Sequence, residues 1–401
     1  MNPKDFDVAT DASPEEVKAL FRNSRIIGRR FRLVHVVFGR DIVEVATFRA
    51  DHSSGSGGQM GSDGRILRDN VFGSIEEDAL RRDFTVNALY FNIEDNTVVD
   101  FVGGMEDLRL GVFRLLGDPV QRCEEDPVRA LRAARLAAKL DFSIDEETLD
   151  AMYETAPMLE SMPPARLFEE TLKMFQGGYA VKSFEKLLEL NLFEFLFPAT
   201  AERLEKRATV AIDESLEDDT ERQLIVAALK NTDARVQKGL PITPAYLLAF
   251  MQWGGIYRRA RKLLLDGNSP SDALWRAGED LLPVQQHVTA IPRRFSGPMR
   301  EIWGMQPALE QYSGPRTLGL MENRRFRAAY DFLCLRASFD ESLAACANWW
   351  TDVQEMDDEQ QQEFVADKPV VTEHWGESSK RRRRSRKNKT RRNTRAKSSN
   401  K

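Results

Sequence analysis

The sequence predicts an α+β protein: a small mixed β-sheet with helices, then a long all-helical part and a basic tail. Strand-like segments rich in Val, Ile and Phe occur early, at 29–39 and 41–49. From about residue 105 the strand patterns fade and helical periodicity continues to about 365. The segment 376–401 has almost nothing apolar to bury, so we expect it to be disordered when free.

Composition excludes several protein classes. The 401 residues are 42% hydrophobic, and no apolar run is long enough for a transmembrane helix. The first residues are charged and lack the apolar core of a secretory signal. The three cysteines form no CxxC pair, which argues against a disulfide scaffold or a zinc site. We expect a cytoplasmic monomer that does not associate with a membrane.

Charge is distributed unevenly along the chain. The net charge is only −5, but the segment from Lys380 to the end holds 13 Lys and Arg and no acidic residue. The rest of the chain therefore carries −18. An acidic body with a basic arm suggests a polyanionic partner, either nucleic acid or an anionic membrane. We favour RNA, with Arg381, Arg382, Arg383 and Arg384 as candidate contacts.

The first elements follow from local signals. The segment 14–22 should be a helix, since Ser13 can cap it, Pro14 suits its first turn and Glu16 completes a capping box. A strand, a helix and two strands in that order give a small mixed sheet with a helix on it. The Gly- and Ser-rich segment 51–65 should be a loop.

The next elements are predicted to be mostly helical. The segment 74–92 reads as a helix of two to three turns, and 96–104 as a short strand that ends in a Gly turn. The segment 124–140 is a strongly periodic helix, and 163–178 is a helix with Pro at its start and Gly at its end. Further helical patterns fill the chain to about 365.

Asp5 and Asp7 are the first candidate chemical residues. On a strand, side chains two residues apart share a face, so these carboxylates would lie side by side. Two hard oxygen ligands suit Mg²⁺, which commonly binds one or two carboxylates together with substrate phosphates. That arrangement serves two-metal nucleotidyl transfer. The pair alone is also compatible with two solvated charges on a surface strand.

A third carboxylate should lie nearby, and Glu44 and Asp83 are the candidates. Glu44 belongs to a strand that should pair near the first one, although it could be a simple edge charge. Asp83 could instead cap a helix or pair with an arginine. A second group consists of Arg81, Arg82 and Asn87, and it also has two interpretations. The guanidinium groups bind the phosphate oxygens of a nucleotide bidentately, or they form an ion-pair network with the acidic residues at 76–78.

A third cluster consists of Glu125, Asp126 and Arg129, which span little more than one helical turn. A carboxylate accepts from an exocyclic amine and a guanidinium donates to ring nitrogens or carbonyls, so such a set can read a base edge. The alternative is an exposed, salt-bridged helix start.

These motifs together resemble the bacterial class II nucleotidyltransferases, which include CCA-adding enzymes and bacterial poly(A) polymerases. The resemblance rests on DFDVATDA, VEVATFR, EEDALRRDFTVNALYFN, VVDFVGGMEDL, EDPVRALRAARLAAKL and PPARLFEETLK in that order, over about residues 3–180. It implies a polymerase-β-like palm and addition of nucleotides to an RNA 3′ end without a template. Mg²⁺ as cofactor and ATP as substrate follow from the same resemblance.

The resemblance also implies residue roles and boundaries. Asp5, Asp7 and Asp83 match catalytic positions, the first two as metal ligands; Arg82 and Asn87 match nucleotide contacts; Glu125, Asp126 and Arg129 match the set that selects the base; Arg166 and Glu169 match neck positions. The expected divisions are a head at 1–104, a neck at 105–180, a helical RNA-binding body at 181–375 and a disordered tail at 376–401.

Later segments favour the poly(A) polymerase branch of the family. The Arg-containing stretch IIGRRFRLVHVVFG, the body segments KNTDARV and RFRAAYDFLCLRA, and the basic tail all resemble it. We therefore expect AMP transfer from ATP to RNA, with RNA-degradation proteins as possible partners. CCA addition to tRNA is the alternative. The Gly-Gly segment that binds triphosphate in this family is expected before the Asp5 strand, and none precedes Met1. A truncated, inactive RNA-binding homologue is therefore a further alternative.

Overall fold

The chain folds into two compact units, which divide near residue 159. The computed structural model describes residues 7–28, 32–50, 59–60, 66–68, 71–210, 220–310 and 315–367. The α+β class is confirmed, because the sheets lie in the first unit and the second unit is helical in its described part. The division falls inside the expected neck, 105–180.

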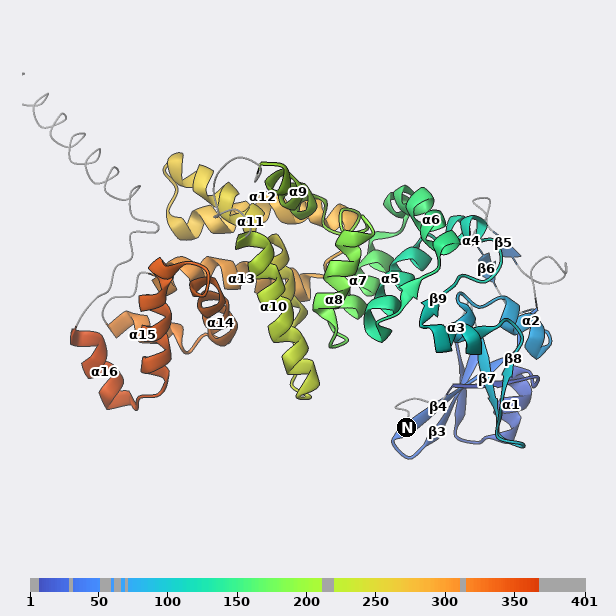
Figure 1. The fold of residues 1–401 in the computed structure, drawn as a ribbon. Coiled ribbons are helices and arrows are strands. Elements are labelled where there is room, and N and C mark those ends of the chain that lie inside the picture. The colour runs from blue at the N-terminus through green and yellow to red at the C-terminus, as the bar shows by residue number, and fades with distance from the viewer. Residues whose placement is uncertain are drawn as a thin grey trace, which may run out of the picture. The chain divides into compact units, whose positions relative to one another are not determined.

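A four-stranded sheet forms the start of the first unit, with the strand order β1-β4-β3-β2. Figure 1 shows two of its strands, β3 and β4, in blue. Its strands and helix are β1 (Asp7–Thr10), α1 (Pro14–Leu20), β2 (Ser24–Ile27), β3 (Leu33–Phe38) and β4 (Asp41–Thr47). β1 runs parallel to β4, and the other pairs are antiparallel, so the expected mixed sheet is present. Val17 of α1 packs on Val34, Val36 and Val45 of the sheet, and this contact covers one face.

The capping box at Ser13 is confirmed. The Ser13 hydroxyl accepts from the Glu16 N–H, and the Glu16 carboxylate accepts from the Ser13 N–H at 2.8 Å. The expected loop at 51–65 lies largely outside the described residues. Within it the backbone of β5 (Gln59–Met60) pairs with β6 (Ile66–Arg68), so a short strand interrupts the loop.

The prediction of a helix over 74–92 is wrong for most of that segment. Only α2 (Ile75–Leu80) is helical; a single turn η2 (Thr85–Asn87) follows, and β7 (Leu89–Asn92) pairs with β8 (Thr97–Asp100). Phe84 is fully buried and forms a β-bridge with Leu115. This long-range pairing holds the segment extended, so tertiary contacts override its local helical pattern.

The periodic helix of 124–140 is split into two. Pro127 separates α4 (Pro119–Glu125) from α5 (Val128–Leu140), since Pro lacks the N–H that would continue the helix. The other elements of the first unit are α3 (Gly104–Leu110), β9 (Val112–Phe113), β10 (Ser143–Ile144), α6 (Glu146–Thr155) and η3 (Ala156–Ser161), which extends just past the division. The parallel pair β9–β10 was not expected from the sequence.

The second unit is built from helices. They are α7 (Pro164–Phe175), α8 (Ala180–Glu189), α9 (Pro198–Val210), α10 (Thr220–Gln237), α11 (Pro244–Leu265), α12 (Pro270–Val288), α13 (Arg293–Glu310), η4 (Pro315–Leu320), α14 (Phe326–Ala337), η5 (Glu341–Leu343), α15 (Ala344–Gln354) and α16 (Asp358–Asp367). Trp349 and Trp350 are buried in its core. Across the described part of the chain, every helix is too short or too polar to span a bilayer.

Candidate nucleotidyltransfer site

The sheet aligns four polar side chains in one row. Asp7 of β1 pairs in register with Glu44 of β4, Glu44 with His35 of β3, and His35 with Arg25 of β2. Residues that pair in this way point to the same face, so Asp7 and Glu44 lie side by side. His35 Nε2 lies 2.9 Å from Glu44 Oε1 and orients that carboxylate. Asp5 lies outside the described residues.

The two carboxylates in this row, of Asp7 and Glu44, are donors of the type that a divalent cation binds. Asp7 is exposed, and both Asp7 and Glu44 offer the hard oxygen atoms that Mg²⁺ prefers. Within the described residues, however, no cluster of three or more His, Cys, Asp or Glu side chains is arranged to hold a metal ion. The metal assignment of Asp5 and Asp7 therefore stays a prediction.

Asp83 lies between two arginines of α5. Its Oδ1 accepts from Arg129 Nε at 3.0 Å, and its Oδ2 pairs with Arg132 Nη2 at 2.7 Å. This pairing was one of the two alternatives that the sequence left open, and it balances the Asp83 charge without a metal. The network fixes the RRDFT segment against α5, the helix that carries Arg129.

Arg82 and Asn87 lie close together through a separate set of contacts. Arg82 pairs with Asp78 at 3.2 Å and donates to the Tyr90 hydroxyl at 3.0 Å and to the Asn87 carbonyl at 3.3 Å. Tyr90 in turn donates to Asp78 at 2.6 Å. The Asn87 side chain is exposed, so it is free to meet a ligand from solvent. Of the three acidic residues at 76–78 that the sequence offered as partners, Asp78 forms the ion pair with Arg82.

Glu125, Asp126 and Arg129 surround the break between α4 and α5. Arg129 pairs with Glu125 at 3.2 Å as well as with Asp83, and Asp126 is the residue at which α4 ends. Glu125 is exposed, whereas the Arg129 side chain is only 12% exposed. Because the Arg129 guanidinium is mostly buried and is held by its ion-pair partners, its N–H groups keep a fixed direction.

Sequence reasoning missed Arg122 and Arg132. Arg122 Nη2 donates at 2.9 Å to the carbonyls of Arg81 and Arg82, and its Nη1 pairs with Glu125 at 2.9 Å. Burial and the neighbouring Arg129 lower the pKa of Arg122. Cationic side chains gathered in this way attract a polyanion such as a triphosphate. The recurrence of Arg at 129, 132 and 135 was visible in the sequence, but its direction was not.

The turn after β8 and the helix α3 that follows it contact the RRDFT segment, residues 81–85, at Thr85. Asp100 accepts hydrogen bonds from the N–H groups of Val102, Gly103, Gly104 and Met105 at 2.9–3.0 Å. Gly104 approaches the segment so closely that a Cβ there would lie 2.2 Å from the Thr85 carbonyl oxygen. Asp107 then accepts from the Thr85 hydroxyl at 2.6 Å. The VVDFVGG motif thus positions residues 83–87.

Replacing Asp100 with Ala should destabilise this turn in a pH-dependent way. Burial alone would raise the pKa of Asp100, but its four backbone donors together lower it. A lowered folded-state pKa means that the stabilisation is fully present above the usual carboxyl pKa and is lost as the pH falls through the folded value. At neutral pH we expect a loss of about 1–2 kcal/mol for this partly exposed group.

Thermal unfolding of Asp100→Ala and wild type, measured at several pH values, tests this expectation. Glu94→Ala, at an exposed position of the preceding turn, is the control. The Tm difference for Asp100→Ala should shrink toward low pH. A difference that is independent of pH would show that the carboxylate charge does not stabilise the turn.

Comparison with known proteins identifies the family of the chain. Family models match three segments: "Poly A polymerase head domain" at 1–114, "Probable RNA and SrmB- binding site of polymerase A" at 141–204 and "Polymerase A arginine-rich C-terminus" at 266–389. The chain is 45% identical over 359 residues to poly(A) polymerase I of Escherichia coli O6:H1, which covers 88% of this chain and 75% of the relative. The chain belongs to the poly(A) polymerase I family. The expected resemblance is thereby confirmed.

CCA-adding enzymes are more distant relatives of this poly(A) polymerase family member. The enzyme of Bacillus licheniformis is 34% identical over 197 residues, 48% of this chain and 47% of that protein. A solved tRNA nucleotidyltransferase, complexed with a primer tRNA and an incoming ATP analogue, shares the fold at a TM-score of 0.54 and 20% identity. That alignment covers 88% of this chain and 92% of the other. It supports the nucleotidyltransferase fold, whereas identity favours the poly(A) polymerase branch.

Proposed function

We propose that this chain adds AMP from ATP to RNA 3′ ends without a template. One observation carries the proposal: in a member of the poly(A) polymerase I family, Asp83, Arg129 and Glu125 form one contact network within the unit that also carries Asp7. The network joins the segments that the resemblance assigns to catalysis and to base selection. Adenylation of this kind would promote mRNA turnover in the cytoplasm.

Each residue has a role in the proposed reaction. Asp5 and Asp7 would hold Mg²⁺, which would activate the RNA hydroxyl and stabilise the leaving pyrophosphate. Glu44, fixed by His35, supplies a further carboxylate on the same sheet face. Arg82 and Asn87 contact the nucleotide, while Asp83 acts through the arginines that it fixes. Arg129, together with Glu125 and Asp126, reads the adenine edge.

The basic tail would hold RNA by charge. Arg381, Arg382, Arg383 and Arg384 lie outside the described residues, so this role rests on composition alone. Guanidinium groups neutralise phosphates irrespective of sequence, which suits an enzyme that extends many RNAs. RNA-degradation proteins remain candidate partners.

Primer extension by the purified chain tests the proposed function. Supplied with oligo(A), Mg²⁺ and one nucleotide at a time, it should lengthen the primer with ATP far more than with CTP. A tRNA that lacks its CCA end is the discriminating substrate, because efficient CTP incorporation into it would establish the CCA-adding alternative. Binding of RNA without incorporation of any nucleotide would indicate an inactive homologue.

A further inference from the structure

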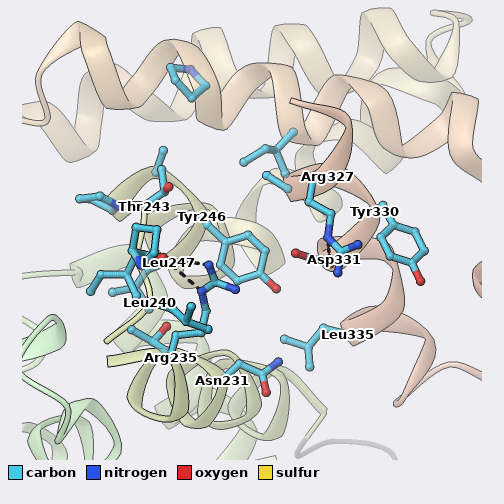
Figure 2. A pocket seen from close by; sticks show the side chains of 18 of the residues that line it. Asn231, Arg235, Leu240, Thr243, Tyr246, Leu247, Arg327, Tyr330, Asp331 and Leu335 are labelled. Atoms are coloured by element: carbon cyan, nitrogen blue, oxygen red, sulfur yellow. Dashed lines mark hydrogen bonds and ion pairs between the residues drawn. The ribbon is translucent and has the colours of Figure 1, made fainter. Parts of the chain in front are cut away.

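The helical unit contains a pocket that the proposed reaction does not use. It lies between α10, the start of α11, α13 and α14 (Figure 2). Its volume is about 980 Å³. Ligand pockets in proteins commonly measure roughly 300–1,000 Å³, so this one is large enough for a nucleotide. Its lining residues all belong to the second unit. We call it the α10–α14 pocket.

The α10–α14 pocket is basic, although the chain before Lys380 is acidic as a whole. Its basic lining residues are Arg235, Lys238, Arg324, Arg325 and Arg327, against the single acidic residue Asp331. Residues 220–340, which include the helices around the pocket, hold 17 Lys and Arg against 11 Asp and Glu, so this part of the chain is positively charged although the chain before Lys380 carries −18 overall. A concave surface of that sign concentrates anions, and phosphodiesters in particular.

Side chains deeper in the pocket offer hydrogen bonds of both kinds. The Tyr246 ring packs against Phe250 and Phe332, at centroid distances of 5.0 and 6.4 Å, and its hydroxyl points into the space in front of α14 (Figure 2). Hydrogen bonds to that hydroxyl are absent within the described residues. Burial raises the pKa of Tyr246, so the phenol stays protonated and can donate.

Asp331 provides the acceptor beside this donor. Its Oδ1 pairs with Arg327 Nε at 3.0 Å, its side chain is 35% exposed, and it lines the pocket. Burial raises the pKa of Asp331, and Arg327 opposes that rise. The exposed amide of Asn231 lines the same space. Donor, acceptor and amide groups beneath a cationic rim match a nucleobase attached to a phosphate.

We propose that the α10–α14 pocket binds a nucleotide of the RNA strand upstream of the reacting 3′ end. The phosphate lies on the rim at Lys238 and Arg324, and the base enters toward Tyr246 and Asp331. This inference rests on the proposed function, because it takes RNA as the substrate. The pocket would keep the strand bound between successive additions while the 3′ end is extended in the first unit.

Binding of labelled oligo(A), measured without ATP over a salt series, tests the proposal. The double variant K238Q/R324Q removes two exposed rim cations. The matched control K262Q/R276Q removes two exposed cations outside the pocket, on α11 and α12. The rim variant should bind roughly threefold to tenfold more weakly and lower the log–log salt slope by about 0.7, the value for one phosphate contact on a single strand.

The variant Y246F removes the hydroxyl of Tyr246 deeper in the pocket and changes no charge. It should weaken oligo(A) binding about fivefold, as expected for one lost hydrogen bond, with an unchanged salt slope. Rim and control variants that behave alike, together with a Y246F variant that binds like wild type, would overturn the proposal. Unchanged Tm values establish that the variants fold.

Extension kinetics separate an RNA strand from a free nucleotide. The rim variant should raise the KM for oligo(A) and leave both the KM for ATP and kcat unchanged. A raised KM for ATP alone would identify the pocket as a mononucleotide site and overturn the proposal. Absence of extension by the wild type would contradict the proposed function, whereas the binding measurements would still judge the pocket.

Discussion

Replacing Asp7 with Asn should lower AMP incorporation by roughly a thousandfold or more while oligo(A) binding is retained. Asp7 is an exposed carboxylate on β1, in register with Glu44, and the substitution keeps its size but removes the charge that would hold Mg²⁺. A metal ion contributes several kcal/mol of transition-state stabilisation, and about 1.4 kcal/mol corresponds to a factor of ten in rate.

Single-turnover extension of oligo(A) at saturating ATP measures this effect directly. Asp11→Asn, at an exposed position just beyond β1, is the matched control and should retain wild-type activity. The dependence of the remaining rate on Mg²⁺ concentration adds a second readout. An Asp7→Asn enzyme with wild-type activity would remove Asp7 from the catalytic site.

Replacing Arg129 with Ala should lower kcat/KM for ATP about a hundredfold and reduce the preference for ATP over CTP. Arg129 contacts both Asp83 and Glu125, so its loss frees the RRDFT segment. It also removes the donor that we propose for the base. A lost contact to a charged, mostly buried group corresponds to about 3 kcal/mol, which gives this factor.

A double-mutant cycle separates base reading from positioning. If Asp83 acts through Arg129, Asp83→Ala and Arg129→Ala should be strongly non-additive, since each disrupts the same ion pair. Arg109→Ala, on the exposed end of α3, is the control. Additive effects would show that Asp83 acts independently of Arg129, as a catalytic carboxylate would.

The wrong prediction of a helix over 74–92 shows where local sequence signals cease to determine the structure. Its acidic first turn and its capping box at Ser74 are real, and they start α2 correctly. Beyond Leu80 the segment pairs instead with residues about thirty positions later, through Phe84 and Leu115. Burial of Phe84 outweighs the weak local preference for helix, and no pattern within the segment reveals that partner.

The sequence by itself determined the fold class and the family, and it predicted the residues that we expect to carry the chemistry. The alternation of apolar and polar residues, the helix caps and the linked motifs are properties of short stretches of sequence, so they can be recognised without a structure. Only the tertiary structure placed Arg129 and Arg132 on Asp83, 46 residues away for Arg129, and brought four separate helices, α10, α11, α13 and α14, together around the α10–α14 pocket. Such contacts depend on the packing of distant segments, which the order of residues along one helix or strand does not specify.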